Sequence, residues 1–244
     1  MIAYKCDGSV DGILCCLYRS FIKSEEPYAV FSSDFQPSFD TVVFDVPTEK
    51  DKAKRVAQGV IKNCSLNLLN GARFAMRSGD GLKETVIFKA LKKCLAARKD
   101  ISADYSDYDI LAFNDLISAI CKEIHRFKGF LRFEEGNGGV LYAHFEPDND
   151  ISDLLLPHFK SRFPTQKFII HDVKRNIVAA YDGKESNVFT LSGGLTVFLS
   201  DEERDYRSLF KTYFNSVSIK ERKNERAQDN FLPRRYRKNM TEFL

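Results

Sequence analysis

The part of the chain with the clearest chemical character reads HRFKGFLRF and spans residues 125–133. It alternates cationic side chains with phenylalanines. Cations neutralise phosphate charge, and flat apolar rings offer a surface on which nucleobases stack. The pattern therefore predicts a site for a phosphate-bearing partner, formed by His125, Arg126, Lys128 and Arg132. It does not indicate a reaction.

Further cationic and aromatic side chains follow later in the sequence. His158 and Arg162 lie four residues apart, which places them on one face of a helix. The C-terminal word RRYRKNMTEF combines a ring with phosphate-binding groups. We expect additional nucleic-acid contacts from His144, His158, Arg162, Arg234, Arg235 and Tyr236. Two other interpretations stay open: ordinary solvated charges, or a tail that docks against residues 125–162.

A β-hairpin over residues 129–146 decides whether these groups share a surface. An odd register would place five apolar side chains on one face, namely Leu131, Phe133, Leu141, Ala143 and Phe145. Their burial, at ~1.5–3 kcal/mol each, favours this register over a two-residue Asn-Gly turn. Arg132 would then lie with Tyr142 and His144 on the opposite face.

The four histidines all lie in the second half of the chain. None has a partner at the usual ligand spacing, so we expect neither a metal nor another cofactor. A metal-dependent nuclease or hydrolase remains an alternative, because acidic residues surround the hairpin and Asp172 with Lys174 follows an apolar run. These acidic residues are Glu134, Glu135, Glu146, Asp148 and Asp150. Helix capping and turns explain such positions equally well.

The second half of the chain resembles a bacterial family of probable DNA metabolism proteins. Three segments carry the resemblance: HRFKGFLRF, AHFEPDND and LLPHFKSRF. The likeness covers residues ~120–244, with Tyr181-Asp182-Gly183 and LPRRYRKNMTEF as further matching words. The domain of this family also occurs fused to uracil-DNA-glycosylase-like domains. The resemblance implies a role in DNA metabolism and leaves the mechanism open.

The opening of the chain, YKCDGSVDGILCCLYRSF, resembles a subgroup of that family whose genes lie beside a radical-SAM DNA-modification protein. The resemblance therefore implies such a protein as partner. Three aromatic positions that are commonly Trp in the family are here Phe168, Tyr181 and Arg237. This departure weakens any claim that these positions bind a base by indole stacking.

Composition limits the classes of protein to which the chain can belong. The 244 residues are 43% hydrophobic and carry a net charge of only +3, so nucleic-acid binding must depend on where the charge lies. Residues 219–238 hold eight basic and three acidic side chains, a larger excess than that of the whole chain. No apolar run of membrane-spanning length and no leader pattern is visible, so we expect a cytoplasmic protein.

The six cysteines contain no CxxC or CxxxCxxC spacing. We expect reduced core thiols and no iron–sulfur cluster of the radical-SAM type in this polypeptide. Radical chemistry, if involved, belongs to the partner.

Apolar periodicity predicts the elements that position these residues. A strand at 2–6, a turn at Asp7-Gly8 and a helix capped by Ser9 open the chain. Next we expect a strand at 42–46 and a helix starting near Thr48, which opens a helical region to about residue 76. Two further helices follow, the last over residues 107–127.

From Gly129 the apolar period shortens from 3.6 to 2. Strands are expected at 129–135, 140–146, 167–172 and 177–181, with helices at 150–162 and 201–215 and a short basic helix capped by Ser218 and Glu221. We predict an α+β fold in which a helical region packs with a mostly antiparallel sheet and C-terminal helices follow. We expect two regions, a mainly helical one over residues 1–105 and an α+β one over residues 106–244. The two could also form one continuous domain.

The leading hypothesis is a DNA-binding accessory protein of DNA modification or repair that acts with a separately encoded radical-SAM or glycosylase-like enzyme. The alternatives are the nuclease or hydrolase above and a protein-interaction module that does not bind DNA. The sequence leaves open whether the chain is catalytic, which base or strand state it prefers, and its oligomeric state.

Overall fold

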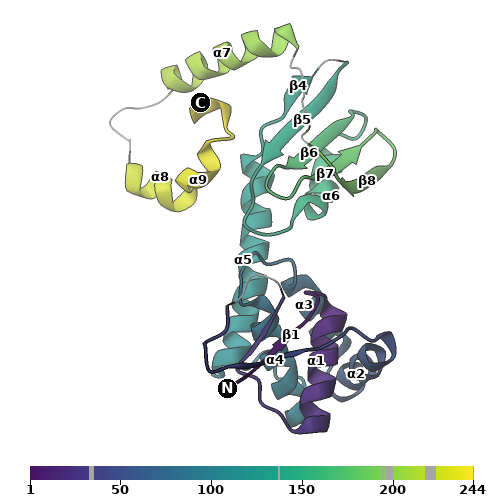
Figure 1. Cartoon of the computed structure of the whole chain (residues 1–244). Helices are drawn as coiled ribbons and strands as arrows, with labels where there is room; N and C mark the ends of the chain where they lie inside the picture. The colour runs from purple at the N-terminus through teal and green to yellow at the C-terminus, as the bar shows by residue number, and fades with distance from the viewer. Residues whose placement is uncertain (33–35, 137, 194, 196–199, 218–223, 244) are drawn as a thin grey trace. The chain divides into compact units, whose positions relative to one another are not determined.

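A computed structural model describes residues 1–244 except 33–35, 137, 194, 196–199, 218–223 and 244. It confirms the α+β class, with helices and two separate sheets (Figure 1). The chain divides into two compact units, residues 1–121 and 122–244. The predicted division at residues 105 and 106 stays a prediction. Within the described part of the chain, no helix is long and apolar enough to cross a membrane.

The first unit contains a three-stranded parallel sheet in the order β2-β1-β3. Its strands are β1 (Ile2–Lys5), β2 (Ala29–Phe31) and β3 (Val42–Asp45). The predicted strand, turn and helix at the start of the chain are confirmed. The Ser9 hydroxyl accepts a 2.9 Å hydrogen bond from Gly12 N–H and so caps the helix, as expected. Gly8 makes the turn at φ +76°, a conformation that favours glycine. The three-residue strand β2 was not predicted.

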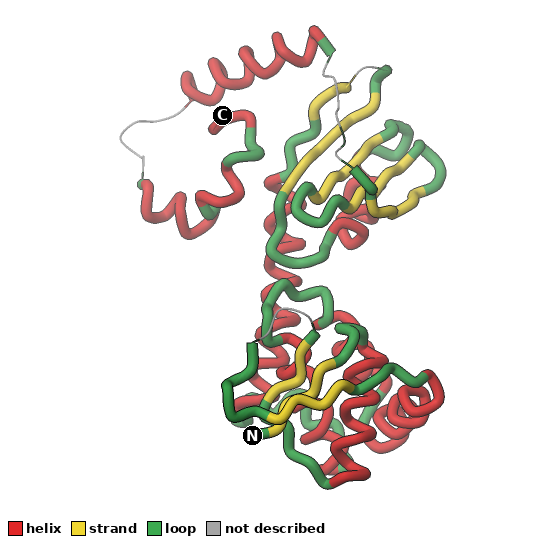
Figure 2. Tube along the Cα trace, in the orientation of Figure 1, coloured by secondary structure: helices red, strands yellow, loops and turns green. Residues whose placement is uncertain are grey.

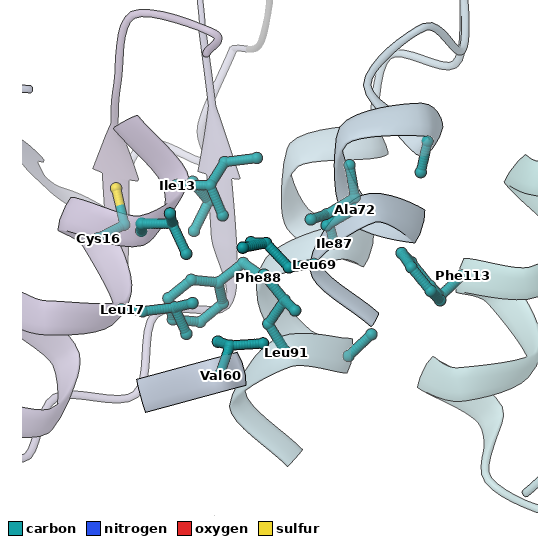
Figure 3. Close-up of a cluster of buried hydrophobic side chains, with 14 of the residues drawn as sticks. Ile13, Cys16, Leu17, Val60, Leu69, Ala72, Ile87, Phe88, Leu91 and Phe113 are labelled. Atoms are coloured by element: carbon teal, nitrogen blue, oxygen red, sulfur yellow. The ribbon is translucent and has the colours of Figure 1, made fainter. Parts of the chain in front are cut away.

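Helices cover this sheet and enclose the core of the first unit (Figure 3). They are α1 (Val10–Lys23), α2 (Lys50–Asn63), α3 (Leu66–Ala75) and α4 (Lys83–Ala97). Helix α2 begins close to the predicted start, but Thr48 does not cap it. Glu49 occupies the N-cap position, and the Thr48 hydroxyl donates instead to the Asp7 carboxylate at 2.8 Å.

Helix α5 (Tyr108–Phe130) extends beyond the predicted end at residue 127. The strand predicted from residue 129 is therefore wrong over 129–133. Phe127 and Leu131 are buried four residues apart, and this helical spacing extends the apolar face past Gly129. Gly129 is exposed and a side chain there would meet nothing, so its position does not interrupt packing.

The second unit contains a five-stranded sheet whose strands follow each other in chain order (Figure 2). They are β4 (Glu134–Gly136), β5 (Val140–Phe145), β6 (Phe168–Asp172), β7 (Ile177–Tyr181) and β8 (Ser186–Thr190). Three pairs are antiparallel, and β5 pairs with β6 in parallel. Helix α6 (Ser152–Arg162) makes the connection that a parallel pair requires, and it continues through Pro157. Strand β8 was not predicted.

The C-terminal part of the second unit is helical, as expected. It comprises α7 (Asp201–Val217), α8 (Glu225–Phe231), α9 (Arg234–Arg237) and a 3-10 turn at Thr241–Phe243. The predicted cap by Ser218 and Glu221 lies outside the described residues. Asn224 caps α8, accepting a 2.9 Å hydrogen bond from Ala227 N–H.

Candidate nucleic-acid surface

The C-terminal end of α5 presents two faces of opposite character. Glu123 and Phe127 are buried on one face. His125 and Lys128 are exposed, and Arg126 is half-buried. None of these three cations pairs with an acidic side chain in the part of the chain that the structure describes. Lys122, which the sequence patterns did not single out, is also exposed at this end of α5.

The phenylalanines of HRFKGFLRF do not form the exposed stacking surface that we expected. Phe127 packs edge-on against Phe145 at 4.9 Å and against Tyr236 at 4.8 Å between ring centroids. Phe133 packs against Phe159 at 4.9 Å on the other side of the segment. The rings alternate with cations because apolar burial and solvation favour opposite sides of the backbone.

Arg132 lies between α5 and β4 and not on a strand. Its guanidinium binds the Glu242 carboxylate through two hydrogen bonds of 2.6 and 3.2 Å, and also donates to the Gly129 carbonyl at 2.8 Å. The Glu242 side chain is only 5% exposed. Paired carboxylate recognition of this kind fixes geometry strongly, so Arg132 anchors the C-terminus.

The C-terminal cations are likewise paired with acidic side chains of the same unit. Arg235 lies 2.6 Å from Asp148, and Lys238 lies 2.6 Å from Glu146. Both Arg234 and Arg237 bind Asp229, at 2.9 and 2.6 Å. The tail therefore docks within the second unit, as one of the open interpretations stated.

Tyr236 is buried in this docked tail and offers no free ring face for a base. Its hydroxyl donates to Glu123 at 2.7 Å, and burial followed by the hydrogen bond to Glu123 raises the pKa of the Tyr236 phenol. The Glu123 carboxylate also accepts from Asp148 N–H, Asn149 N–H and the Asn149 amide at 2.8, 2.9 and 2.6 Å. The sequence patterns did not single out Glu123, because its partners Asn149 and Tyr236 lie 26 and 113 residues away.

One face of the sheet brings His144 close to a second histidine. The pairing Glu134↔Tyr142 and Gly136↔Val140 confirms the odd register, but Leu131 and Phe133 precede β4 and do not lie on its face as expected. His144 stacks on Tyr142 at 5.8 Å and neighbours His171 across the parallel pair β5 and β6. The Tyr142 hydroxyl and His171 Nδ1 are 2.9 Å apart.

His171 is buried, and its Nε2 atom has no hydrogen-bond partner among the described residues. Burial, with a smaller contribution from His144, lowers the pKa of His171, so its imidazole is neutral at pH 7. Nearby on this face, Arg207 of α7 pairs with Glu134. The arrangement places Glu134, Tyr142, His144 and His171 on one face of the sheet.

His158 and Arg162 project differently from α6. The His158 ring packs against Phe159 at 4.8 Å, and its Nε2 atom is buried without a partner in the described chain. Arg162 is exposed beside the Phe163 ring. Of this pair, Arg162 is the one that presents its charge to solvent.

The hairpin carboxylates do not converge on one point. Glu134 lies on the face that carries Tyr142 and His171, whereas Asp172, the next residue after His171, lies on the opposite face. Asp172 is buried and binds Arg175 at 2.9 Å. No group of three His, Cys, Asp or Glu residues suited to a metal ion occurs within the described ranges. Glu134 and Asp172 therefore cannot share a metal in this fold.

Comparison with known proteins defines the family. The profile of a domain of unknown function, DUF4130, matches residues 82–242, and the chain belongs to this family. No curated protein matches the chain. A solved structure described as the pGpG-specific phosphodiesterase PggH from Vibrio cholerae is 8% identical, with 89% of this chain and 99% of that chain covered and a TM-score of 0.35. A likeness at that level carries no functional argument.

Proposed function

We propose that this member of the DUF4130 family is a DNA-binding accessory protein of DNA modification or repair. It acts with a separately encoded radical-SAM or glycosylase-like enzyme, as the resemblance of its sequence words implies. The observation that carries the proposal is the set of cations at the end of α5, namely His125, Arg126 and Lys128, without acidic partners in the described chain.

The contrast with the tail supports this location. Arg235 and Lys238 already neutralise Asp148 and Glu146, so a phosphate would have to displace a carboxylate from each. Lys128 and Arg126 need no such exchange. Unpaired surface cations contact phosphates at lower cost, and such contacts release counterions from DNA. The α5 end is therefore the proposed phosphate-binding surface, with Arg162 as an additional contact.

Fluorescence anisotropy with labelled single- and double-stranded oligonucleotides tests the proposal. Wild-type affinity should fall as salt rises, and three phosphate contacts correspond to a slope of roughly −3 in log K against log salt on duplex DNA. Lys128→Glu should weaken binding on every sequence, whereas Lys62→Glu, an exposed cation on α2, serves as the matched control. Affinity that does not change with salt, or equal loss in both variants, contradicts the proposed surface.

A second candidate function, protein interaction without DNA binding, is favoured by α7. Its apolar side chains Tyr206, Leu209, Phe210 and Tyr213 follow helical spacing and are all exposed. Exposed apolar stripes of this kind mark interaction sites. A pull-down from native lysate, with Leu209→Glu as the variant, tests it. Capture of the partner together with absence of DNA binding at low salt would favour this function over the first.

A further inference from the structure

A cavity of about 220 Å³ lies in the first unit, between the second half of α1 and the start of α2. The two helices pack side by side (Figure 1). Apolar walls are formed by Tyr18, Ile22, Val46 and Pro47. Ile22 is 64% exposed, and exposed apolar surface beside a hollow is typical of a site that a partner covers. The proposed DNA surface uses no residue of this cavity.

The rim of the cavity carries three cationic side chains and one carboxylate. Arg19 is held by Glu25 at 2.9 Å. Lys52 pairs with Glu49 at 2.6 Å, but both side chains are exposed to solvent, and such pairs exchange partners readily. Lys23 is exposed and forms no ion pair with any residue that the structure describes. The rim is therefore positive and accessible to carboxylates.

Helix α2 extends this positive rim, because it carries five cations and one carboxylate over residues 50–63. Lys50 and Lys54 are exposed and four residues apart, and like charges at that spacing repel each other on a helix. Arg55 is also exposed and shares a face of α2 with Lys52, three residues before it. Lys50, Lys54 and Arg55 form no ion pair within the described part of the chain. A negatively charged partner would relieve this repulsion.

The size and the polar atoms of the cavity decide which kind of molecule it suits. Cofactors and small molecules occupy cavities of roughly 300–1,000 Å³, whereas an apolar cavity of ~150 Å³ holds one benzene ring. One large apolar side chain therefore fits. A nucleobase fits less well, because the polar atoms of its edge would lack partners. Arg19 and Lys52 are already paired, and the Cys15 sulfur lies 3.3 and 3.4 Å from the Glu49 amide nitrogen and carbonyl oxygen.

We propose that this cavity and the cations around it are the docking site for an acidic segment of a partner protein. The segment inserts one large apolar side chain between Tyr18 and Ile22, and its carboxylates contact Lys23, Lys52 and Arg55. A buried apolar anchor supplies most of the affinity in such interfaces, and charge complementarity supplies orientation and speed of association. The proposal does not depend on the DNA surface of the second unit, so the two can fail separately.

Selection of random short peptides, displayed on phage, against the full-length protein supplies the probe, and the enriched peptide is synthesised with a fluorescent label. Enriched sequences should combine Asp or Glu with a large apolar residue. Ile22→Gln should weaken anisotropy-measured binding at least about tenfold, and Phe21→Gln, at an exposed neighbour outside the cavity, is the matched control. Absence of enrichment, enriched peptides without acidic residues, or equal binding by both variants overturns the proposal.

A second pair of variants tests the charges with the apolar wall intact. Lys23→Glu should weaken peptide binding severalfold and flatten its dependence on salt, whereas Lys62→Glu, at an exposed cation outside the cavity, should change neither. Circular dichroism checks that each variant is folded. Two results would assign the cavity to another occupant and so reject an acidic partner segment. One is displacement of the peptide by an oligonucleotide in the wild type and Lys62→Glu alike, and the other is a dimer in analytical ultracentrifugation that Ile22→Gln dissociates.

Discussion

The Tyr236 hydroxyl donates a 2.7 Å hydrogen bond to Glu123 across 113 residues of sequence. The same carboxylate accepts from Asn149, so one buried acid joins the end of α5, the loop after β5 and the C-terminal tail. The RRYRKN word thus serves in packing, although its composition is that of a phosphate-binding segment.

Tyr236→Phe isolates the hydrogen bond, because the ring can keep its contact with Phe127 at 4.8 Å. Loss of a hydrogen bond to a charged acceptor should lower the free energy of unfolding by about 1.5–3 kcal/mol. Urea denaturation measures the change. Arg234→Ala is the control, since Arg234 is exposed, and its midpoint should match that of the wild type. Equal midpoints for Tyr236→Phe and the wild type would contradict the buried junction.

Truncation after Phe231 removes Tyr236 and Met240, both buried, together with the Glu242 carboxylate that binds Arg132. Loss of a large buried aromatic side chain alone costs about 3–5 kcal/mol. The melting temperature of the truncated protein should therefore fall markedly. Scanning calorimetry of the full and truncated chains measures it. A melting temperature within a few degrees of the wild type would instead return the tail to the role of a solvated, DNA-contacting segment.

Charge reversal at two neighbouring cations should have different results. Lys128 is exposed, so Lys128→Glu should change the unfolding free energy by no more than about 0.5 kcal/mol and weaken DNA binding. Arg132→Glu would set two carboxylates against each other at Glu242 and should cost about 3 kcal/mol. Urea midpoints and DNA anisotropy on both variants make the comparison. Similar stability of the two variants would show that the Arg132 pair is dispensable.

His171 should make the stability of the second unit depend on pH. Its folded pKa is lowered from 6.5, chiefly by burial, so the unfolded chain binds the proton more readily than the folded chain. Stability from this group is complete above pH 6.5 and decreases as the pH falls from there toward the folded pKa. NMR titration of the imidazole should give a midpoint below 6.5, and His171→Gln should reduce the loss of stability between pH 7 and 5. A midpoint at or above 6.5 rules out this effect.

Features that depend on neighbouring residues could be predicted from the sequence. The Ser9 cap of α1 rests on a contact with Gly12, three residues away. The odd hairpin register was predicted from apolar residues that should share one face, although only Leu141, Ala143 and Phe145 of the five lie on a strand. The α+β class follows from the change of apolar period along the chain. Strand β2 has three residues, too few for a period to be recognised. Strand β8 is as long as β6 and β7, but it is almost entirely exposed and so lacks their apolar pattern.

The partners of the cations could not be predicted, because a charge near water pairs with whichever opposite charge the fold brings near it. Arg132 and Glu242 are 110 residues apart, and Lys238 and Glu146 are 92 apart. The end of α5 is a related case. The apolar pattern of residues 129–131 fits a strand as well as a helix, and the packing of Phe127 on Phe145 extends the helical face. The sequence by itself determined which residues carry charge and which are apolar. Tertiary structure decided which charges are neutralised internally and which remain open, because that depends on distances between remote segments.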